Sequence, residues 1–435
     1  MEKIISLAKR RGFIYQGSEI YGGLAGTWDY GPLGVSLKNN IRDLWWSRFV
    51  RERDDMYGVD AAILMNAKVW EAAGHVAGFA DPLVECKKCK KRFRSDHLPA
   101  QTGSDGDKCP ECGGELGEER QFNMMFKTSV GALEDSSSIS YLRPETAQGM
   151  FVNFKNIIDS FHPKLPFGMA QIGKAFRNEI TPRDFIFRTR EFEQMEIEYF
   201  IKESEWEKHF DYWKEEMKKW ISDIGLSDEH VHEIEVSPED RAHYSKRTID
   251  FEYDFPFGRS EMYGLAYRTD FDLRSHMKDS KVNLEYLDES TNEKFIPHVI
   301  EPTFGVDRTI LALLVEAYTE DEMGEGKRVY LKFKPQIAPV KAAVFPLMKN
   351  KPELVEKARS VYLALKKEIP QVMWDDNGNV GKRYRRQDEI GTPYCITIDF
   401  DTLENDTVTV RDRDTGEQQR MEISELADYV KNAIK

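Results

Sequence analysis

The sequence predicts two domains that mix helices and strands, the first interrupted by a small cysteine-rich insertion. Two arginine-bearing segments, residues 176–192 and 301–315, each combine a strand pattern with a turn before the next element. Four cysteines fall in two Cys-x-x-Cys pairs between residues 86 and 112, and strands alternate with helices after residue 335. A chain of 435 residues, 40% of them hydrophobic, is long enough for two or three domains.

Residues 176–192, FRNEITPRDFIFRTREF, predict a strand, a basic and aromatic loop, and a returning strand. Arg177 and Arg188 can bind phosphate oxygens through charge-assisted hydrogen bonds, and Phe192 offers a flat ring on which a purine can stack. An ordinary charged hairpin explains the segment alone about equally well, because residues 181–184 read simply as a turn.

A second segment favours the nucleotide interpretation. Residues 301–308, EPTFGVDR, precede the apolar run TILALLV, so Gly305 to Arg308 should open a helix. A glycine-bearing turn before a helix N-terminus suits a polyphosphate, and an arginine just inside that helix can cover a base.

Together these two segments resemble motifs 2 and 3 of the class II aminoacyl-tRNA synthetases. Residues 29–34 (DYGPLG), a helix expected over 40–50 and a strand expected over 58–65 (GVDAAILM) resemble motif 1, the dimer interface of that class. Three segments narrow the resemblance to the dimeric glycyl-tRNA synthetases: WDYGPLG at 28–34, RPETAQG at 143–149 and EQMEIE at 193–198. The resemblance covers nearly the whole chain.

This resemblance implies an α+β catalytic domain over residues 1–335, an antiparallel sheet with helices, and an α/β anticodon-binding domain over 336–435. In the family, glycine attacks the α-phosphate of ATP to give glycyl adenylate and pyrophosphate, and the 3′ end of tRNA-Gly then accepts the glycine. Arginines and Mg²⁺ can neutralise the phosphates, and Glu261 matches the family's metal-serving carboxylate. A strand-edge carboxylate facing water is the alternative for Glu261. The resemblance leaves open a side activity that makes diadenosine tetraphosphate.

Matching motif positions imply roles for the ATP-binding residues. Arg177 should contact the α-phosphate and the glycine carboxylate, and Arg188 the γ-phosphate. Arg308 should cover adenine opposite Phe192. The full set implied for ATP is Arg177, Asn178, Glu179, Phe187, Arg188, Thr189, Arg190, Glu191, Phe192, Glu261, Met262, Gly305, Val306, Asp307 and Arg308.

Glycine has no side chain to recognise, so selectivity must come from holding its ammonium and excluding anything larger. The resemblance implies that carboxylates hold the ammonium and that Arg268 and Thr303 form the pocket wall. Family members often have serine where Thr303 stands, so the fine shape of the pocket differs. The full set implied for glycine is Glu145, Glu196, Arg268, Glu301, Thr303 and Arg94, although Arg94 also fits a solvated basic turn. No segment predicts an editing domain.

The four cysteines Cys86, Cys89, Cys109 and Cys112 have the spacing of a zinc ribbon, within an insertion over about 84–121. Four thiolates at about 2.3 Å complete a closed tetrahedral zinc site. Two disulfides or free thiols are the alternatives, and disulfides are uncommon in a chain that shows no secretion signal. Cys395 reads as a buried strand residue.

Beyond residue 335, strands are expected over 341–347, 371–374, 394–400 and 407–410, with helices over 354–365 and 423–434. This order resembles the anticodon-binding domain that several class II synthetases share. Arg383, Tyr384 and Arg386 lie in a basic run that could combine phosphate contacts with base stacking, and a solvated charged turn is the alternative. The aromatic residues of 205–224 have helical spacing and favour a packed helix over a ligand cage.

The formal net charge of −14 argues against nonspecific coating of nucleic acid but permits a specific RNA partner. The sequence lacks a membrane-length apolar run and a signal-peptide pattern at Met1 to Arg10, so a cytoplasmic protein is expected. The resemblance to motif 1 implies a homodimer. Two competing functions stay open: a synthetase-like accessory protein that binds nucleic acid without adenylation, and an adenylating enzyme for a small acid without an RNA partner. The intact arginine motifs oppose the first, and the C-terminal domain opposes the second.

Overall fold

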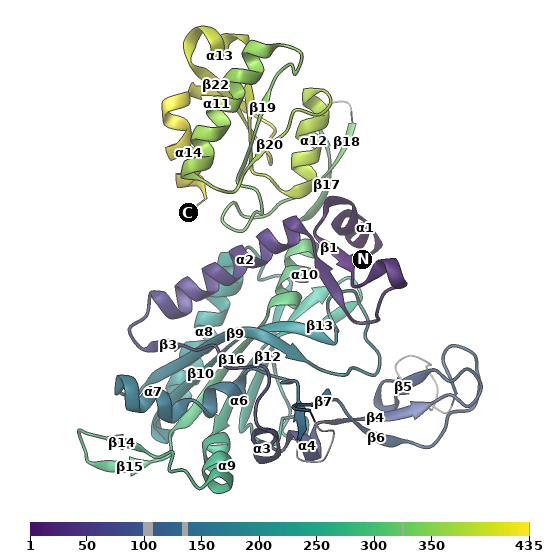
Figure 1. Cartoon of the computed structure of the whole chain (residues 1–435), viewed down its shortest axis with the longest axis vertical. Coiled ribbons are helices and arrows are strands. Elements are labelled where there is room, and N and C mark those ends of the chain that lie inside the picture. The colour runs from purple at the N-terminus through teal and green to yellow at the C-terminus, as the bar shows by residue number, and fades with distance from the viewer. Residues whose placement is uncertain (99–107, 133–137, 324–325, 435) are drawn as a thin grey trace.

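The structure, a computed structural model, describes residues 1–98, 108–132, 138–323 and 326–434. Figure 1 shows a large N-terminal body, a smaller C-terminal body above helix α2, and a thin arm of strands projecting from the large body. The expected insertion lies in this arm, although its residues 99–107 fall outside the described part of the chain. In the described residues, no helix is long and apolar enough to cross a membrane.

A seven-stranded sheet forms the centre of the large body. All neighbouring strands run antiparallel except the edge pair β3 and β9, which is parallel. The sheet confirms the expected α+β class. In spatial order its strands are β11 (Val231–Glu235), β12 (Arg247–Phe255), β13 (Gly258–Thr269), β16 (His298–Gly305), β10 (Glu191–Ile201), β9 (Phe167–Phe176) and β3 (Met56–Gly58).

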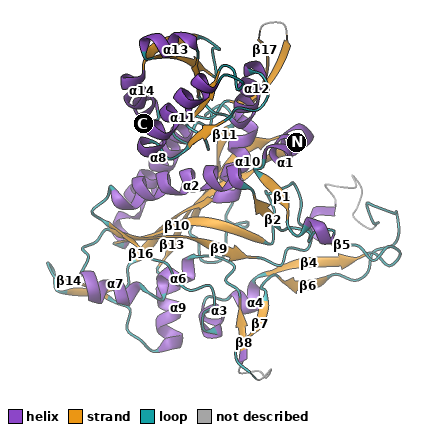
Figure 2. Ribbon diagram, turned by 45° about the horizontal axis from the view of Figure 1, so that its top comes forward, coloured by secondary structure: helices purple, strands orange, loops and turns teal. Residues whose placement is uncertain are grey.

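Helices cover both faces of this sheet, as Figure 2 shows. On one face lie α2 (Pro32–Trp46), α8 (Trp206–Ile224) and α10 (Val306–Ala317), whose apolar residues join the main core. On the other lie α6 (Ala147–Phe151), α7 (Phe154–Phe161) and α9 (Phe271–Ser280), which bury a smaller core. The aromatic helix expected over 205–224 is therefore confirmed as a core helix.

The alternation of strand β10 decides which residues reach the face of the sheet that lies away from the main core, here called the functional face. Successive side chains of a strand point to opposite faces. Met195, Ile197 and Tyr199 pack into the main core, so Glu196 and Glu198 face the other side. Strand β16 repeats this pattern, with Ile300 and Phe304 in the core and Glu301 and Thr303 on the functional face.

The remaining parts of the large body are short elements. The arm holds the three-stranded sheet β5-β4-β6, and further strand pairs and helices lie around the central sheet. Their bounds are α1 (Glu2–Arg11), β1 (Ile14–Gln16), β2 (Trp28–Tyr30), α3 (Ala67–Ala72), α4 (His75–Gly78), β4 (Ala80–Glu85), β5 (Arg92–Arg94), β6 (Arg120–Asn123), β7 (Lys127–Ser129), β8 (Ile139–Tyr141), β14 (Tyr286–Asp288), β15 (Glu293–Phe295), β17 (Tyr318–Met323) and β18 (Gly326–Leu331).

The C-terminal body is a five-stranded sheet flanked by helices, as the alternating sequence pattern predicts. Its first three strands are parallel and the last two antiparallel. The strands, in spatial order, are β20 (Val372–Trp374), β19 (Ala342–Pro346), β21 (Tyr394–Ile398), β22 (Thr407–Asp412) and β23 (Gln418–Glu422). The helices are α11 (Pro352–Glu368), α12 (Val380–Ile390), α13 (Phe400–Asn405) and α14 (Leu426–Ala433).

The segment just past the expected boundary at residue 335 packs on the large body. Ile337, Ala338 and Val340 belong to the main core of the large body. Asn40 on α2 donates to the carbonyls of Ile337 and Ala338 at 3.1 and 3.0 Å, which fixes this segment on the large body. The separate C-terminal core begins at Ala342.

Three local expectations differ from the structure. Residues 177–190 form a loop, because the strands β9 and β10 end at Phe176 and begin at Glu191. The strand expected over 58–65 ends at Gly58, apart from a bridge at Leu64, and helix α2 starts at Pro32 rather than at residue 40. The basic run near 383–386 lies on helix α12 and not in the charged turn that was the alternative for it.

Candidate active site

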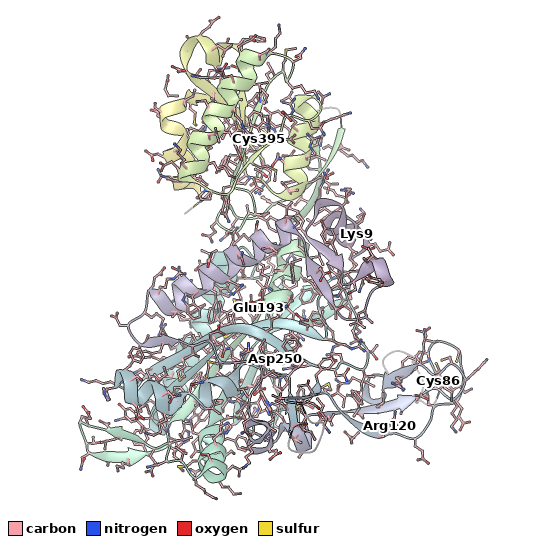
Figure 3. The ribbon with its side chains drawn as sticks, in the orientation of Figure 1. Lys9, Cys86, Arg120, Glu193, Asp250 and Cys395 are labelled. Carbon is pink, nitrogen blue, oxygen red and sulfur yellow. The ribbon has the colours of Figure 1, made fainter. Side chains whose placement is uncertain are left out.

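A cavity of about 330 Å³ opens on the functional face of β10, β13 and β16. Figure 3 shows Asp250 in this central region, while Cys86 lies far away on the arm. Of the residues expected from the sequence, those that line the cavity are Glu145, Arg177, Glu179, Phe187, Arg188, Thr189, Phe192, Glu196, Glu261, Met262, Glu301, Thr303, Gly305, Asp307 and Arg308.

Two arginine–aromatic pairs form one end of this cavity. The Arg308 guanidinium lies 4.4 Å from the centre of the Phe187 ring, and Arg177 lies 5.2 Å from the centre of Phe192. Arg177 also donates to the carbonyl of Pro144 at 3.1 Å. Arg308 was expected to cover adenine opposite Phe192, and this stays a prediction; in the structure its guanidinium lies over Phe187. These flat cationic and aromatic groups suit a base beside phosphates.

Positive charge gathers at Arg188, between the two pairs. Its guanidinium donates to Glu179 at 3.3 Å, while its Nε is buried without a partner in the described residues. Burial lowers the pKa of Arg188, and Arg308 and Arg94 act in the same direction although Glu179 opposes them. A pocket that crowds arginines in this way favours a polyanion, which would relieve their mutual repulsion.

Two carboxylates face these arginines across the cavity. Glu261 on β13 accepts from Arg308 at 3.0 Å and has a side chain that is 49% exposed. Burial favours the neutral form of the Glu261 carboxyl group. The positive charges of Arg308, Arg177 and Arg188 nevertheless hold its pKa below the usual value. Asp250 on β12 was not expected from the sequence; burial and the Glu261 charge raise its pKa to about 7.

A pit of buried carboxylates forms the other end. Glu196 accepts a hydrogen bond from the Thr146 hydroxyl and another from Thr303 at 3.0 Å. Arg268, 1% exposed, lies beneath the pit and donates to Glu301 at 2.6 Å. The pit is therefore polar, enclosed and rich in negative charge, which suits a small cation.

Glu145 completes the pit from the loop before α6. His75 Nε2 lies 3.2 Å from its carboxylate, and Gln148 donates to it at 3.1 Å. Burial favours the neutral acid, but His75, Arg268 and Gln148 hold the pKa of Glu145 well below its ordinary value. Burial raises the pKa of Glu196, and the Glu145 charge adds to this effect. The pKa values of these two carboxyl groups are therefore shifted in opposite directions.

Some expected site residues lie outside the cavity lining: Asn178, Arg190, Glu191, Val306, Arg268 and Arg94. Arg94 was expected to contact glycine, but its guanidinium bonds Asp81 at 2.6 Å and Asp96 at 2.7 Å. The Glu179 charge raises the pKa of Arg94, and the Arg94 charge lowers the pKa of Arg188. Arg94 therefore interacts with the arginine end of the cavity rather than with the carboxylate pit.

Sequence reasoning missed several groups at this site. Tyr244 lines the cavity and its ring lies 3.8 Å from the Arg268 guanidinium. Asp272 holds Arg268 through two hydrogen bonds of 2.8 Å. Asp250, His75 and these two come from four separate segments without a local motif, so only their packing reveals them.

The cysteine cluster lies in the arm. The Sγ atoms of Cys86 and Cys112 are 3.6 Å apart, as are those of Cys89 and Cys109, and all four lie within 4.8 Å of one another. A disulfide needs about 2.05 Å, so these thiols are free. A tetrahedron with metal–sulfur bonds of about 2.3 Å has edges of about 3.8 Å, so the cluster fits a zinc site. Cys395 is a buried strand residue, as expected.

The C-terminal basic run is less exposed than expected. Arg383 is 1% exposed and donates to the backbone carbonyls of Pro346, Asp376 and Gly378, so it has little to offer RNA. Tyr384 is half-buried, with its hydroxyl 2.7 Å from that of Thr397. Arg386 is partly exposed and bonds Asp375 at 2.9 and 2.8 Å.

Comparison with known families agrees with this geometry. A family model described as the tRNA synthetase class II core domain (G, H, P, S and T) matches residues 126–318, and an anticodon binding domain matches residues 341–433. The chain has the core and anticodon-binding domains of a class II aminoacyl-tRNA synthetase.

Curated relatives define the family more narrowly. The chain is 53% identical to the glycine–tRNA ligase of Clostridium acetobutylicum, over 100% of this chain and 99% of the relative. It is 52% identical to that of Caldanaerobacter subterraneus and 51% identical to that of Geobacillus thermodenitrificans, over 100% of this chain and 98% and 97% of those relatives. The chain belongs to the glycine–tRNA ligase family.

Proposed function

We propose that this chain activates glycine with ATP to form glycyl adenylate and pyrophosphate, and then transfers the glycine to the 3′ end of tRNA-Gly. The observation that carries the proposal is one cavity with arginines at one end and buried carboxylates at the other. Glycine has a carboxylate that must reach the α-phosphate and an ammonium that needs negative partners. The cavity offers both environments within the span of one small substrate.

Arg177 and Arg188 would stabilise the charge that develops on the phosphates during adenylation. Arg177 is held by Pro144 O and the Phe192 ring, so it can keep the α-phosphate in line with the attacking carboxylate. Arg308 would close over the adenine end. Preorganised donors of this kind stabilise the transition state more than the ground state.

Glu261 and Asp250 are the residues that would hold Mg²⁺ with the triphosphate. They are oxygen ligands on adjacent strands at the cavity, and the Glu261 charge raises the pKa of Asp250. When bound, Mg²⁺ would neutralise phosphate charge, while the two carboxylates fix the triphosphate relative to Arg308.

Glu145, Glu196 and Glu301 would bind the glycine ammonium. Thr303 and Thr146 orient Glu196, and Arg268 orients Glu301, so the carboxylates are fixed before substrate enters. Tyr244, which lines the same cavity, would leave little room for a methyl group on the α-carbon. One excess methylene is worth about 1–3 kcal/mol of discrimination, so exclusion would work here without an editing domain.

The C-terminal domain would bind the anticodon arm of the tRNA. Tyr384 and Arg386 are the half-buried candidates that support this, and the burial of Arg383 assigns it a structural role. A zinc ion held by Cys86, Cys89, Cys109 and Cys112 would stabilise the arm, because its small core includes two of these cysteines.

We further propose a homodimer that works in the cytoplasm. Helix α2 matches the helix of motif 1, and Val35 on this helix is 44% exposed. Ile20 and Tyr21 are 89% and 88% exposed. A second copy would cover such a surface. ATP could also attack the bound adenylate, which would make diadenosine tetraphosphate as a side product.

Charging of tRNA with radiolabelled glycine tests the proposal. Purified protein should transfer glycine to tRNA-Gly only when ATP and Mg²⁺ are present. An accessory protein without adenylation would bind tRNA and leave it uncharged, and an adenylating enzyme for another small acid would show no dependence on glycine.

A further inference from the structure

Glu198 is a buried acid for which the site above has no use. It lies on β10 two residues after Glu196, on the functional face, and its side chain is 0% exposed. Neither of its carboxyl oxygens has a hydrogen-bond partner in the described residues. An ionised carboxylate in such a place would lose its hydration without compensation, so its state needs a physical explanation.

The carboxylates of Glu196 and Glu301 flank Glu198. The register pairs Glu196 with Thr303 and Tyr199 with Ile300, which puts Glu198 level with Glu301 on the neighbouring strand. Oxygens from Glu196, Glu198 and Glu301 all lie within 4.8 Å of one another. Three negative charges this close in a dry site would repel one another strongly.

The surrounding charges do not offset a further negative group. Arg268 uses its guanidinium on Asp272 and Glu301. The ammonium of glycine would add one positive charge to a pit that already holds several carboxylates. The titratable groups that face this region from the packed elements are Glu145, Glu196, Glu301, Asp272, Arg268, His75, His276 and Tyr244. Burial raises the pKa of Glu198 well above its ordinary value, and the Glu301 charge adds to this.

We propose that Glu198 is a neutral carboxylic acid that donates a hydrogen bond to Glu301 whenever Glu301 is ionised. It is a positioning residue: it fixes an ammonium ligand and keeps the total negative charge of the pit from rising. The donated bond stabilises the ionised form of Glu301, which is the form that binds an ammonium. This inference rests on the proposed function only in assigning glycine to the pit.

A first test needs no substrate. Unfolded Glu ionises above a pKa of about 4.3, so a residue that stays protonated in the folded chain takes up a proton on folding. Stability is then lost as pH rises above that value, because the folded state binds more protons. Glu198→Gln removes this loss. The melting temperature of the variant should rise relative to that of wild type progressively from pH 5 to pH 8. The matched exposed control Glu404→Gln should show no such trend. A difference that stays constant with pH would overturn the proposal, whatever the enzyme's substrate.

A second test separates a neutral donor from an ionised ligand, using the Michaelis constants of pyrophosphate exchange. Glu198→Met keeps the side-chain length without a donor and should raise the glycine KM about tenfold or more, with the ATP KM unchanged. Glu198→Gln retains a donor and should bring the glycine KM back to within about threefold of wild type. If Glu198→Gln raises the glycine KM as much as Glu301→Gln does, Glu198 is an ionised ammonium ligand and the proposal is wrong. A Glu198→Met variant with a normal glycine KM would also overturn it.

Discussion

Arg308 at the start of helix α10 donates a hydrogen bond of 3.0 Å to the Glu261 carboxylate on strand β13. The same guanidinium donates to the Glu261 carbonyl at 2.8 Å and lies over Phe187. The pair joins two segments 47 residues apart in the chain at the mouth of the cavity. The proposed adenine lid and the proposed metal ligand are therefore held together before ATP binds.

Loss of this pair should damage ATP binding and adenylation together. Arg308→Ala should lower the exchange rate by about two to three orders of magnitude, because the variant loses a preorganised charge and leaves Glu261 without its cation. Arg308→Lys should restore little, since an ammonium lacks the planar face of a guanidinium. Arg259→Ala is the matched control: this arginine on β13 pairs with Asp254 and does not line the cavity. Equal exchange rates for Arg308→Ala and the control would refute the assignment.

The glycine KM should depend on pH through Glu301. Burial raises the pKa of Glu301 to about 8, with Glu196 and Glu145 adding to the effect and Arg268 opposing it. Because an ammonium binds the ionised form, the ionised fraction should limit binding below that pKa. The glycine KM should therefore fall about fivefold between pH 7 and pH 8, while the ATP KM changes little. A glycine KM that stays constant or rises over this range would contradict the proposed charge state.

Removal of zinc should affect the arm and leave the rest of the catalytic body folded. Purified protein should contain about one zinc ion per chain, and Cys86→Ser with Cys109→Ser should release it and make the arm sensitive to protease. Cys395→Ser, on β21 of the C-terminal body, is the control that keeps the four clustered thiols. Zinc-free wild-type protein whose clustered thiols titrate freely would show that the cluster is not a zinc site.

Removal of the C-terminal domain should separate the two half-reactions. A chain that ends after Val340 keeps Ile337 and Ala338 in the main core, and every residue of the cavity lining lies at or before Arg308. Glycine-dependent exchange should persist while charging of tRNA falls steeply, because the surface proposed to hold the anticodon arm is gone. Sedimentation should verify the assembly state of the same preparation. Charging at a normal rate under limiting tRNA would exclude this domain as the anticodon reader.

The sequence predicted the arginines of the site better than the residues that pack around them. Arg177, Arg188 and Arg308 stand in short segments with recognisable patterns, and the structure brings all three to one cavity. Asp250 and Tyr244 have no such pattern, since they reach the cavity only through strand pairing and the packing of a loop over Arg268. Local sequence carries little information about contacts of this kind.

Burial accounts for the clearest differences in the C-terminal domain and the arm. A run of basic residues reads as exposed, but α12 turns Arg383 inward, where three backbone carbonyls accept its hydrogen bonds. Arg94 was assigned by motif position alone, and its ion pairs with Asp81 and Asp96 hold it at the arginine end. The order of the elements was predicted because hydrophobic periodicity is local, whereas the direction of a single charged side chain depends on distant partners.

The measurement that tests the central claim most directly is ATP–pyrophosphate exchange with glycine, alanine and serine in turn. The arrangement of arginines, carboxylate pit and enclosing Tyr244 predicts rapid exchange with glycine, and rates with alanine and serine that are lower by about 10- to 200-fold. It also predicts that Glu301→Gln abolishes most of the glycine-dependent rate. Comparable exchange with all three amino acids, or none with glycine in a folded preparation, would contradict the account.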